Sequence, residues 1–163
     1  MPTKKRKAKA RLQKSQRVKN KKIEAAGGIV FRRTEKNQTE VLMIFRNGFW
    51  DIPKGKREKG ETIEMCARRE VMEEVGADSL PLISNELVSS KHSYDQKGKI
   101  YHKTTYWFAM SFENPQSFTP ETSEGIELVE WVELDKAIGK VGFQNLVPVL
   151  EDFKVKLPDI KKA

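Results

Sequence analysis

Three glutamates, Glu70, Glu73 and Glu74, stand in a segment that contains no proline or glycine and ends at Gly76. Residues three or four apart lie on the same side of a helix, so these carboxylates are expected to project together. Like charges at this spacing repel each other, and a hard divalent cation with oxygen ligands removes the repulsion. The spacing therefore predicts a site for Mg²⁺, with Mn²⁺ as the alternative, because zinc would normally require His or Cys.

Glutamates on a helix more often form a solvent-exposed face, and the residues around these three decide against that explanation. Residues 55 to 77 read GKREKGETIEMCARREVMEEVGA. This segment resembles the Nudix box, G-x5-E-x7-R-E-U-x-E-E-x-G-U, in which U is a bulky apolar residue. It departs from the pattern only at Ala77, where the side chain is smaller, and we expect this to affect packing after the helix and not the chemistry.

The resemblance to the Nudix family implies an α/β fold, the Nudix-type α/β/α sandwich with a mixed central sheet. It also implies a metal-dependent pyrophosphohydrolase in which the Gly55 carbonyl joins the carboxylates of Glu70, Glu73 and Glu74 as metal ligands. Glu61 and Arg69 are usually paired supports that fix the loop against the helix, with Glu61 sometimes contacting metal through water.

The residues of this segment favour direct attack by water on phosphorus, with one carboxylate accepting the proton. In the family the base is either a box glutamate or a residue of a later loop, where Glu124 is the first candidate and Glu127 the second. Cys66 is expected to be a small core residue and not a nucleophile.

The substrate is suggested by the segment before the box, Pro53-Lys54-Gly55-Lys56. It resembles members of the family that hydrolyse diadenosine polyphosphates or diphosphoinositol polyphosphates, where Pro-Lys-Gly is common. Phosphate groups are expected to pair with basic side chains, and a base could stack on Tyr101, Tyr106 or Phe49. The predicted substrate-binding residues are Arg46, Lys54, Lys56, Lys103 and Tyr106.

Three functions remain open. A dinucleoside polyphosphate is the favoured substrate, and a nucleoside triphosphate or an RNA 5′ end is the second candidate. The third is a non-catalytic regulatory module that binds a nucleotide or nucleic acid, which would have no need for three metal-binding carboxylates.

The net charge of +8 comes from one end of the chain. Residues 1–22 hold 11 of the 31 Lys and Arg and no acids, which leaves 20 basic against 23 acidic side chains in the rest. We expect 1–22 to be a disordered tail that could contact a polyanion or nucleic acid, 23–157 to be one catalytic domain, and 158–163 to be a short tail.

Other features of the composition indicate the cellular compartment. Cys66 is the only cysteine, no apolar run approaches the length of a membrane span, and no secretory signal pattern begins the sequence. The sequence therefore predicts a reducing compartment, with the cytoplasm as the default and no membrane partner.

The elements that must position these residues can be read from the apolar pattern. We expect a hairpin of strands 25–33 and 40–45, a short extended piece at 49–52, and a helix over 61–75 with Thr62 near its start as a cap. Strands are then expected at 85–94, 99–112 and 127–134, with a loop over 113–125 and a closing helix over 143–154.

Overall fold

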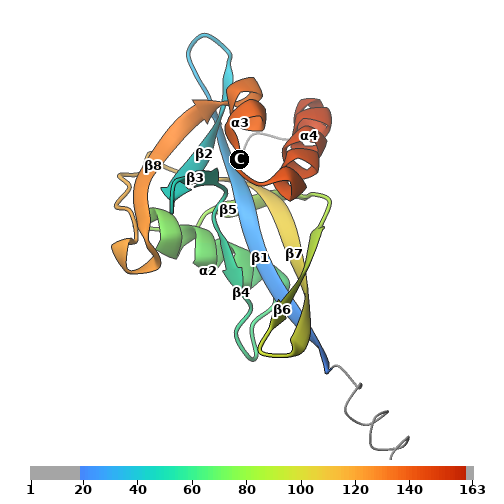
Figure 1. Cartoon of the computed structure of the whole chain (residues 1–163). Coiled ribbons are helices and arrows are strands. Elements are labelled where there is room, and N and C mark those ends of the chain that lie inside the picture. The colour runs from blue at the N-terminus through green and yellow to red at the C-terminus, as the bar shows by residue number, and fades with distance from the viewer. Residues whose placement is uncertain (1–18, 161–163) are drawn as a thin grey trace, which may run out of the picture.

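The computed structural model describes residues 19–160 of the chain as one mixed sheet covered by helices on both sides (Figure 1). The strands are β1 (Asn20–Arg33), β2 (Thr39–Arg46), β3 (Phe49–Asp51), β4 (Lys54–Lys56), β5 (Leu82–Glu86), β6 (Ser90–Gln96), β7 (Lys99–Ser111) and β8 (Ile126–Glu133). The helices are α2 (Ile63–Val75), α3 (Leu134–Lys140) and α4 (Val147–Lys156), with short 3₁₀ turns η1 (Thr122–Glu124), η2 (Gln144–Leu146) and η3 (Leu157–Asp159).

The sheet is mixed because one central pair is parallel. The strand order is β3-β2-β1-β7-β5, with β4 also paired to β1, β6 to β7 and β8 to β2. β1 and β7 run parallel, whereas the other pairs are antiparallel. β1 begins at Asn20, within the segment expected to be a tail, because its first residues pair with β7 from Ile100 onward.

Two apolar clusters occupy the two faces of the sheet. On one face, Ala67, Val71 and Val75 of α2 are fully buried against the sheet, as the helical spacing predicts. On the other face, α3 and α4 cover a cluster that includes Trp107 and Phe153. The predicted α/β/α sandwich with a mixed central sheet is therefore confirmed.

Helix α2 has clear signals at both ends. The Thr62 side chain accepts a hydrogen bond from the Met65 backbone N–H at 3.1 Å, which caps the first turn as expected. Gly76 ends the helix with a left-handed φ of 64°. A Cβ at Gly76 would overlap the Thr119 carbonyl oxygen, so the glycine is required both for its backbone angle and for the loop packed against it.

Besides the earlier start of β1, the structure adds the short strand β4, and the helix expected over 143–154 runs from Val147 to Lys156. Two further differences concern the region of β5 and β6 and helix α3. The single strand expected at 85–94 is interrupted between β5 and β6, where Val88 N–H donates to the Asp152 carboxylate instead of a strand partner. Helix α3 was not expected, because it is short and buries only Leu134 and Ala137. It is started by Glu133, whose carboxylate accepts hydrogen bonds from two backbone N–H groups of the first turn.

No helix within residues 19–160 combines the length and apolar character that crossing a bilayer would require.

We predict that Gly76→Ala lowers the free energy of unfolding by at least about 2 kcal/mol, because it adds backbone strain and a clash with residue 119. Gly48→Ala is the matched control, since Gly48 also has a positive φ, 81°, but no atom lies near its missing side chain. The control should lose only about 1 kcal/mol. Equal losses in urea unfolding would contradict the role given to the contact with residue 119.

Candidate active site

The backbone of β4 and the carboxylate of Glu70 approach each other so closely that no side chain fits between them. A Cβ on Gly55 would overlap the Glu70 carboxyl group. The Gly55 carbonyl oxygen accepts a weak hydrogen bond, 3.5 Å long, from the Cys66 thiol. Gly55 is therefore needed for this close approach between the β4 backbone and the Glu70 carboxyl group.

Glu74 is a buried acid, with 3% of the residue exposed. Its carboxylate accepts a hydrogen bond from the Lys54 backbone N–H at 2.9 Å and faces the Arg46 guanidinium at 3.5 Å. Burial outweighs these favourable contacts and raises the pKa of Glu74 to about 7. Near neutral pH this carboxyl group therefore carries only part of its negative charge, and a bound cation would favour the charged form.

Arg69 connects the loop before α2 to the acidic side chains of the helix. Its guanidinium donates to both carboxylate oxygens of Glu61, at 2.6 and 2.9 Å, and to the Lys56 carbonyl oxygen at 3.2 Å. The contact with Arg69 lowers the pKa of Glu61 to about 2. The structure thus places Glu61 and Arg69 as a bidentate pair that fixes the loop, the arrangement expected from the resemblance.

The three helix glutamates are not equivalent. Glu70 and Glu74 line one cavity of about 360 Å³, whereas Glu73 has 51% of its side chain exposed and contacts Arg69 at 3.2 Å. Arg69 also binds Glu70 at 2.8 Å. The full lining of this cavity is Arg46, Lys54, Gly55, Lys56, Glu70, Glu74, Lys103 and Glu124.

The oxygen atoms of this cavity are of the kind that a hard cation prefers. Glu70, Glu74 and Gly55 line it, and Mg²⁺ commonly takes one or two carboxylates while keeping waters and substrate phosphates. Within residues 19–160 no three His, Cys, Asp or Glu side chains are already close enough to form a complete metal cage. Glu73 would have to leave Arg69 to become a third carboxylate ligand.

Basic residues surround the carboxylates. Lys54, Lys56, Lys103 and Arg46 line the same cavity. Burial, together with the neighbouring positive charges of Lys54 and Lys56, lowers the pKa of Lys103. Such a cluster of cations favours anionic groups, so these four side chains could pair with an anionic ligand.

Asp51 was not identified from the sequence and holds two of these cations in place. The residue is 3% exposed, and its carboxylate accepts from Lys54 Nζ at 2.6 Å and from Arg46 Nη2 at 3.1 Å. The signal was present in the sequence, since Asp51 is the one acid within the apolar segment 49–52. A buried acid needs partners, and the neighbouring basic residues supply them.

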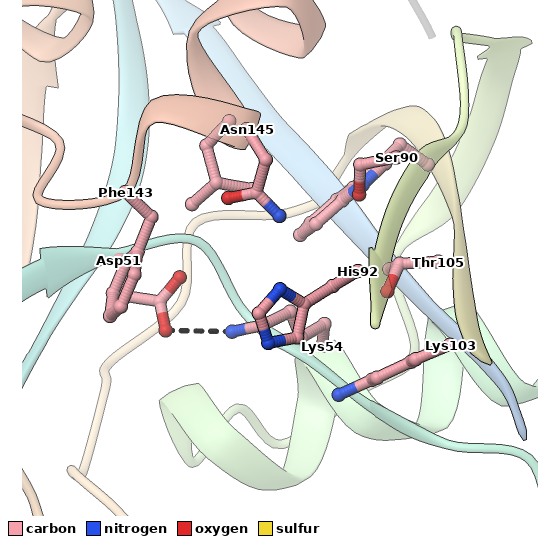
Figure 2. A pocket seen from close by; sticks show the side chains of 10 residues that line it. Asp51, Lys54, Ser90, His92, Lys103, Thr105, Phe143 and Asn145 are labelled. Atoms are coloured by element: carbon pink, nitrogen blue, oxygen red, sulfur yellow. Dashed lines mark hydrogen bonds and ion pairs between the residues drawn. The ribbon is translucent and has the colours of Figure 1, made fainter. Parts of the chain in front are cut away.

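A second cavity of about 240 Å³ adjoins the first, since both are lined by Lys54 and Lys103 (Figure 2). Its walls are mainly apolar, with Trp107 and Phe143 among them, and Figure 2 shows Lys54, His92 and Lys103 pointing into the same space. An aromatic ring system linked to phosphates fits this combination. The remaining lining residues are Asp51, Ser90, Thr105, Asn145 and Leu146.

The sequence alone does not reveal this second cavity, because its walls come from five separate segments of the chain. β3, β4, β6, β7 and the turn before α4 each contribute one or a few residues. Of these segments only β4 belongs to a recognised motif, and only the folded sheet brings the five together.

Tyr106 lies apart from the other predicted substrate-binding residues. Successive side chains of a strand point to opposite faces, so Tyr106 and Lys103 lie on different sides of β7. Tyr106 packs at the edge of the α2 cluster and lines a different hollow with Lys22 and His102. The structure therefore brings Arg46, Lys54, Lys56 and Lys103 to the carboxylates but does not bring Tyr106 there.

The chain is similar to proteins of known family. The model of the NUDIX domain family matches residues 21–153 of the chain. The 8-oxo-(d)GTP phosphatase of Mycolicibacterium smegmatis is 27% identical over 149 residues, which cover 85% of this chain and 44% of that protein. The chain thus spans less than half the length of this relative.

Two other proteins extend the comparison. The RNA pyrophosphohydrolase of Pelagibacter ubique is 27% identical over 125 residues, covering 72% of this chain and 75% of that protein. The crystal structure of a C. elegans Ap4A hydrolase in a binary complex superposes with a TM-score of 0.60 at 20% identity. The superposition covers 85% of this chain and 99% of that chain, and it shows a shared fold.

We predict that the metal-free protein loses stability as pH rises from about 5 to 8. The pKa of Glu74 is raised in the folded state to about 7. Between the ordinary pKa of a glutamate and this value, the folded protein therefore binds more protons than the unfolded chain. The free energy of unfolding falls as the pH rises and the Glu74 carboxyl group loses its proton. The loss should reach about 3 kcal/mol from the pKa difference. Chemical unfolding at several pH values measures it.

Glu74→Gln should largely remove this pH dependence, since the amide carries no charge, whereas Glu64→Gln on the exposed side of α2 should keep it. Added Mg²⁺ should reduce the loss at high pH, because the cation favours the charged carboxylate. An unchanged pH profile in Glu74→Gln would show that other groups cause the dependence.

Proposed function

The chain belongs to the NUDIX family, and on that premise we propose that it is a Mg²⁺-dependent pyrophosphohydrolase acting on nucleoside polyphosphates. The observation that carries the proposal is the shared cavity of Glu70, Glu74 and four basic side chains, with an apolar cavity beside it. Carboxylates suit the cation, the basic side chains suit the phosphates, and the apolar walls suit a base. A single reduced cysteine fits a cytoplasmic location.

Within this proposal, each group of the cavity has a separate task. Glu70, Glu74 and the Gly55 carbonyl would hold the cation, with Glu73 joining them after leaving Arg69. The bound cation supplies Lewis-acid chemistry and neutralises phosphate oxygens. Lys54 and Lys103 line both cavities, which supports a role for them in binding the phosphates that would link a base to the reacting phosphorus.

The proton acceptor proposed here is Glu124. It lines the same cavity as Glu70 and Glu74, whereas Glu127 does not. The oxygen of water would bond to phosphorus while the anhydride P–O bond breaks, the leaving phosphate would take the electron pair, and the carboxylate would take the proton of the water. A box glutamate that is not bound to the cation is the alternative base.

The favoured substrate is a dinucleoside polyphosphate. The apolar cavity has room for one nucleoside, and the basic cavity beside it is open to a chain of several phosphates. The fold shared with the C. elegans Ap4A hydrolase is consistent with this choice. The second candidate is an RNA 5′ end, because the P. ubique relative carries the name RNA pyrophosphohydrolase and residues 1–22 are strongly basic.

A non-catalytic binding module is the competing function of another class. Keeping Glu74 buried without a cation is unfavourable, and a module that only binds nucleotides has no use for that arrangement. Incubation with diadenosine polyphosphates, nucleoside triphosphates and triphosphorylated RNA, with and without Mg²⁺, separates the two classes. Absence of any metal-dependent product would favour the binding module.

We predict that Glu74→Gln lowers kcat on the best small substrate by roughly a thousandfold or more, because it removes a charge from the cation site. Far-ultraviolet circular dichroism should remain that of the unaltered protein. Glu64→Gln is the control on the same helix, at an exposed position, and should retain nearly full kcat. Near-normal turnover in Glu74→Gln would refute the assignment of this residue to the cation.

We predict that removing residues 1–18 leaves kcat/KM for dinucleoside polyphosphates nearly unchanged. The cut precedes β1, so every residue of both cavities and every strand pair of β1 is retained. Steady-state kinetics on the shortened and full chains measure the effect. A large loss of kcat/KM would show that the first 18 residues contribute directly to the site.

A further inference from the structure

One face of the β6–β7 hairpin carries aromatic and basic residues, and several of them, among them Tyr94, Lys99 and Tyr101, line neither of the two cavities. Paired residues of neighbouring strands point to the same face, and the register joins His92 to Lys103, Tyr94 to Tyr101 and Gln96 to Lys99. The parallel partner of Tyr101 on β1 is Lys21. We call the set Lys21, His92, Tyr94, Lys99 and Tyr101 the hairpin platform.

The aromatic rings of the hairpin platform are stacked in a row. Tyr94 and Tyr101 have ring centroids 5.1 Å apart with planes inclined by 12°, and the His92 ring lies 5.7 Å from Tyr94 at 26°. His92 is exposed, and both tyrosines are only partly buried. Tyr94 stacks with both neighbours, so further flat rings would extend the row at its ends, and such stacking needs no particular base identity.

The charge of the hairpin platform is positive. Lys21 is exposed, Lys99 is partly exposed, and the only acids of β1, β6 and β7 are Glu24 and Asp95. Alternation along the strands places both acids on the opposite face, where Glu24 is bound by Arg57. A phosphate backbone on the platform would therefore meet lysines and no carboxylates of these strands.

The platform is continuous with the proposed catalytic site. His92 belongs to the platform and also lines the apolar cavity, beside Lys103, which lines both cavities (Figure 2). At the far end, the platform lies beside the beginning of β1 (Figure 1). The segment attached there, residues 1–18, contains eight Lys and Arg and no acid.

We propose that the hairpin platform binds single-stranded RNA, with the bases extending the row of stacked rings that Tyr94 and Tyr101 build and the backbone on the lysines. The 5′-phosphorylated end of that RNA would pass His92 and enter the cavities. This step rests on the proposed function, whereas RNA binding on the platform does not. Newly started RNA chains carry a 5′-triphosphate, so one molecule contains both a phosphoanhydride bond and a single strand. A short dinucleotide substrate would leave the platform empty.

The test compares the full-length protein with the double variants Tyr94→Thr/Tyr101→Thr and Tyr94→Phe/Tyr101→Phe. Threonine keeps a β-branched residue in the strands but removes the ring, and phenylalanine keeps the ring. The probe is a single-stranded RNA of about ten nucleotides with a 5′-hydroxyl and a 3′-fluorophore, measured by anisotropy in EDTA so that no hydrolysis occurs. Thermal unfolding confirms that both variants are folded.

The threonine variant should bind this RNA at least roughly tenfold more weakly, and the phenylalanine variant should bind like the unaltered protein. Duplex RNA of the same length should show no difference between the variants, because its bases are not free to stack. Equal affinity of the threonine variant and the unaltered protein for single-stranded RNA would overturn the proposal and assign binding to residues 1–18 or to another surface.

Hydrolysis assays on the same variants distinguish a failure of the RNA-binding proposal from a failure of the proposed enzymatic function. The threonine variant should retain kcat/KM for a dinucleoside polyphosphate, since neither tyrosine lines a cavity. Ring-dependent RNA binding by a protein without any pyrophosphohydrolase activity would uphold the platform and refute the enzyme. A threonine variant that has lost dinucleotide hydrolysis would refute the separation of platform and active site.

Discussion

The close approach of two acidic side chains to the backbone of β4 is the constraint on which the rest of the site depends. Glu74 accepts a hydrogen bond from the Lys54 N–H, and Glu70 occupies the space that a side chain at residue 55 would need. The loop can come this near the sheet only because residue 27 is also glycine, where a Cβ would overlap the Pro53 carbonyl oxygen. Two glycines on adjacent strands thus determine where the carboxylates of α2 meet the main chain.

The electrostatic balance of the site follows from that geometry. Burial makes the charged form of Glu74 unfavourable, while the neighbouring pair of Arg69 and Glu61 strongly favours charge and fixes the loop. The two kinds of acid therefore have different roles, one set by desolvation and the other by a bidentate partner. A site of this kind favours a bound cation at Glu74 and leaves Glu61 as a permanent structural anion.

Much of the fold and the acidic centre could be predicted from the sequence, because they depend on local signals. The capped helix with its periodic apolar residues and the Gly55-to-Gly76 spacing each lie within one continuous segment. Asp51, the apolar cavity and the placement of Tyr106 depend on which strands pair and in which register, and no local pattern contains that information. Helix α3 was missed for a related reason, since its stability comes from packing against α4 and β2 more than from its own composition.

The protonated thiol beside the Gly55 carbonyl has a consequence for chemical resistance. Burial raises the pKa of Cys66 to about 12, so almost no thiolate forms at physiological pH. Peroxides and alkylating agents react with thiolates, and the described structure holds no other cysteine. The catalytic apparatus proposed for this chain is built from carboxylates, lysines and main-chain oxygens, so none of its functional groups is a thiol that an oxidant could remove.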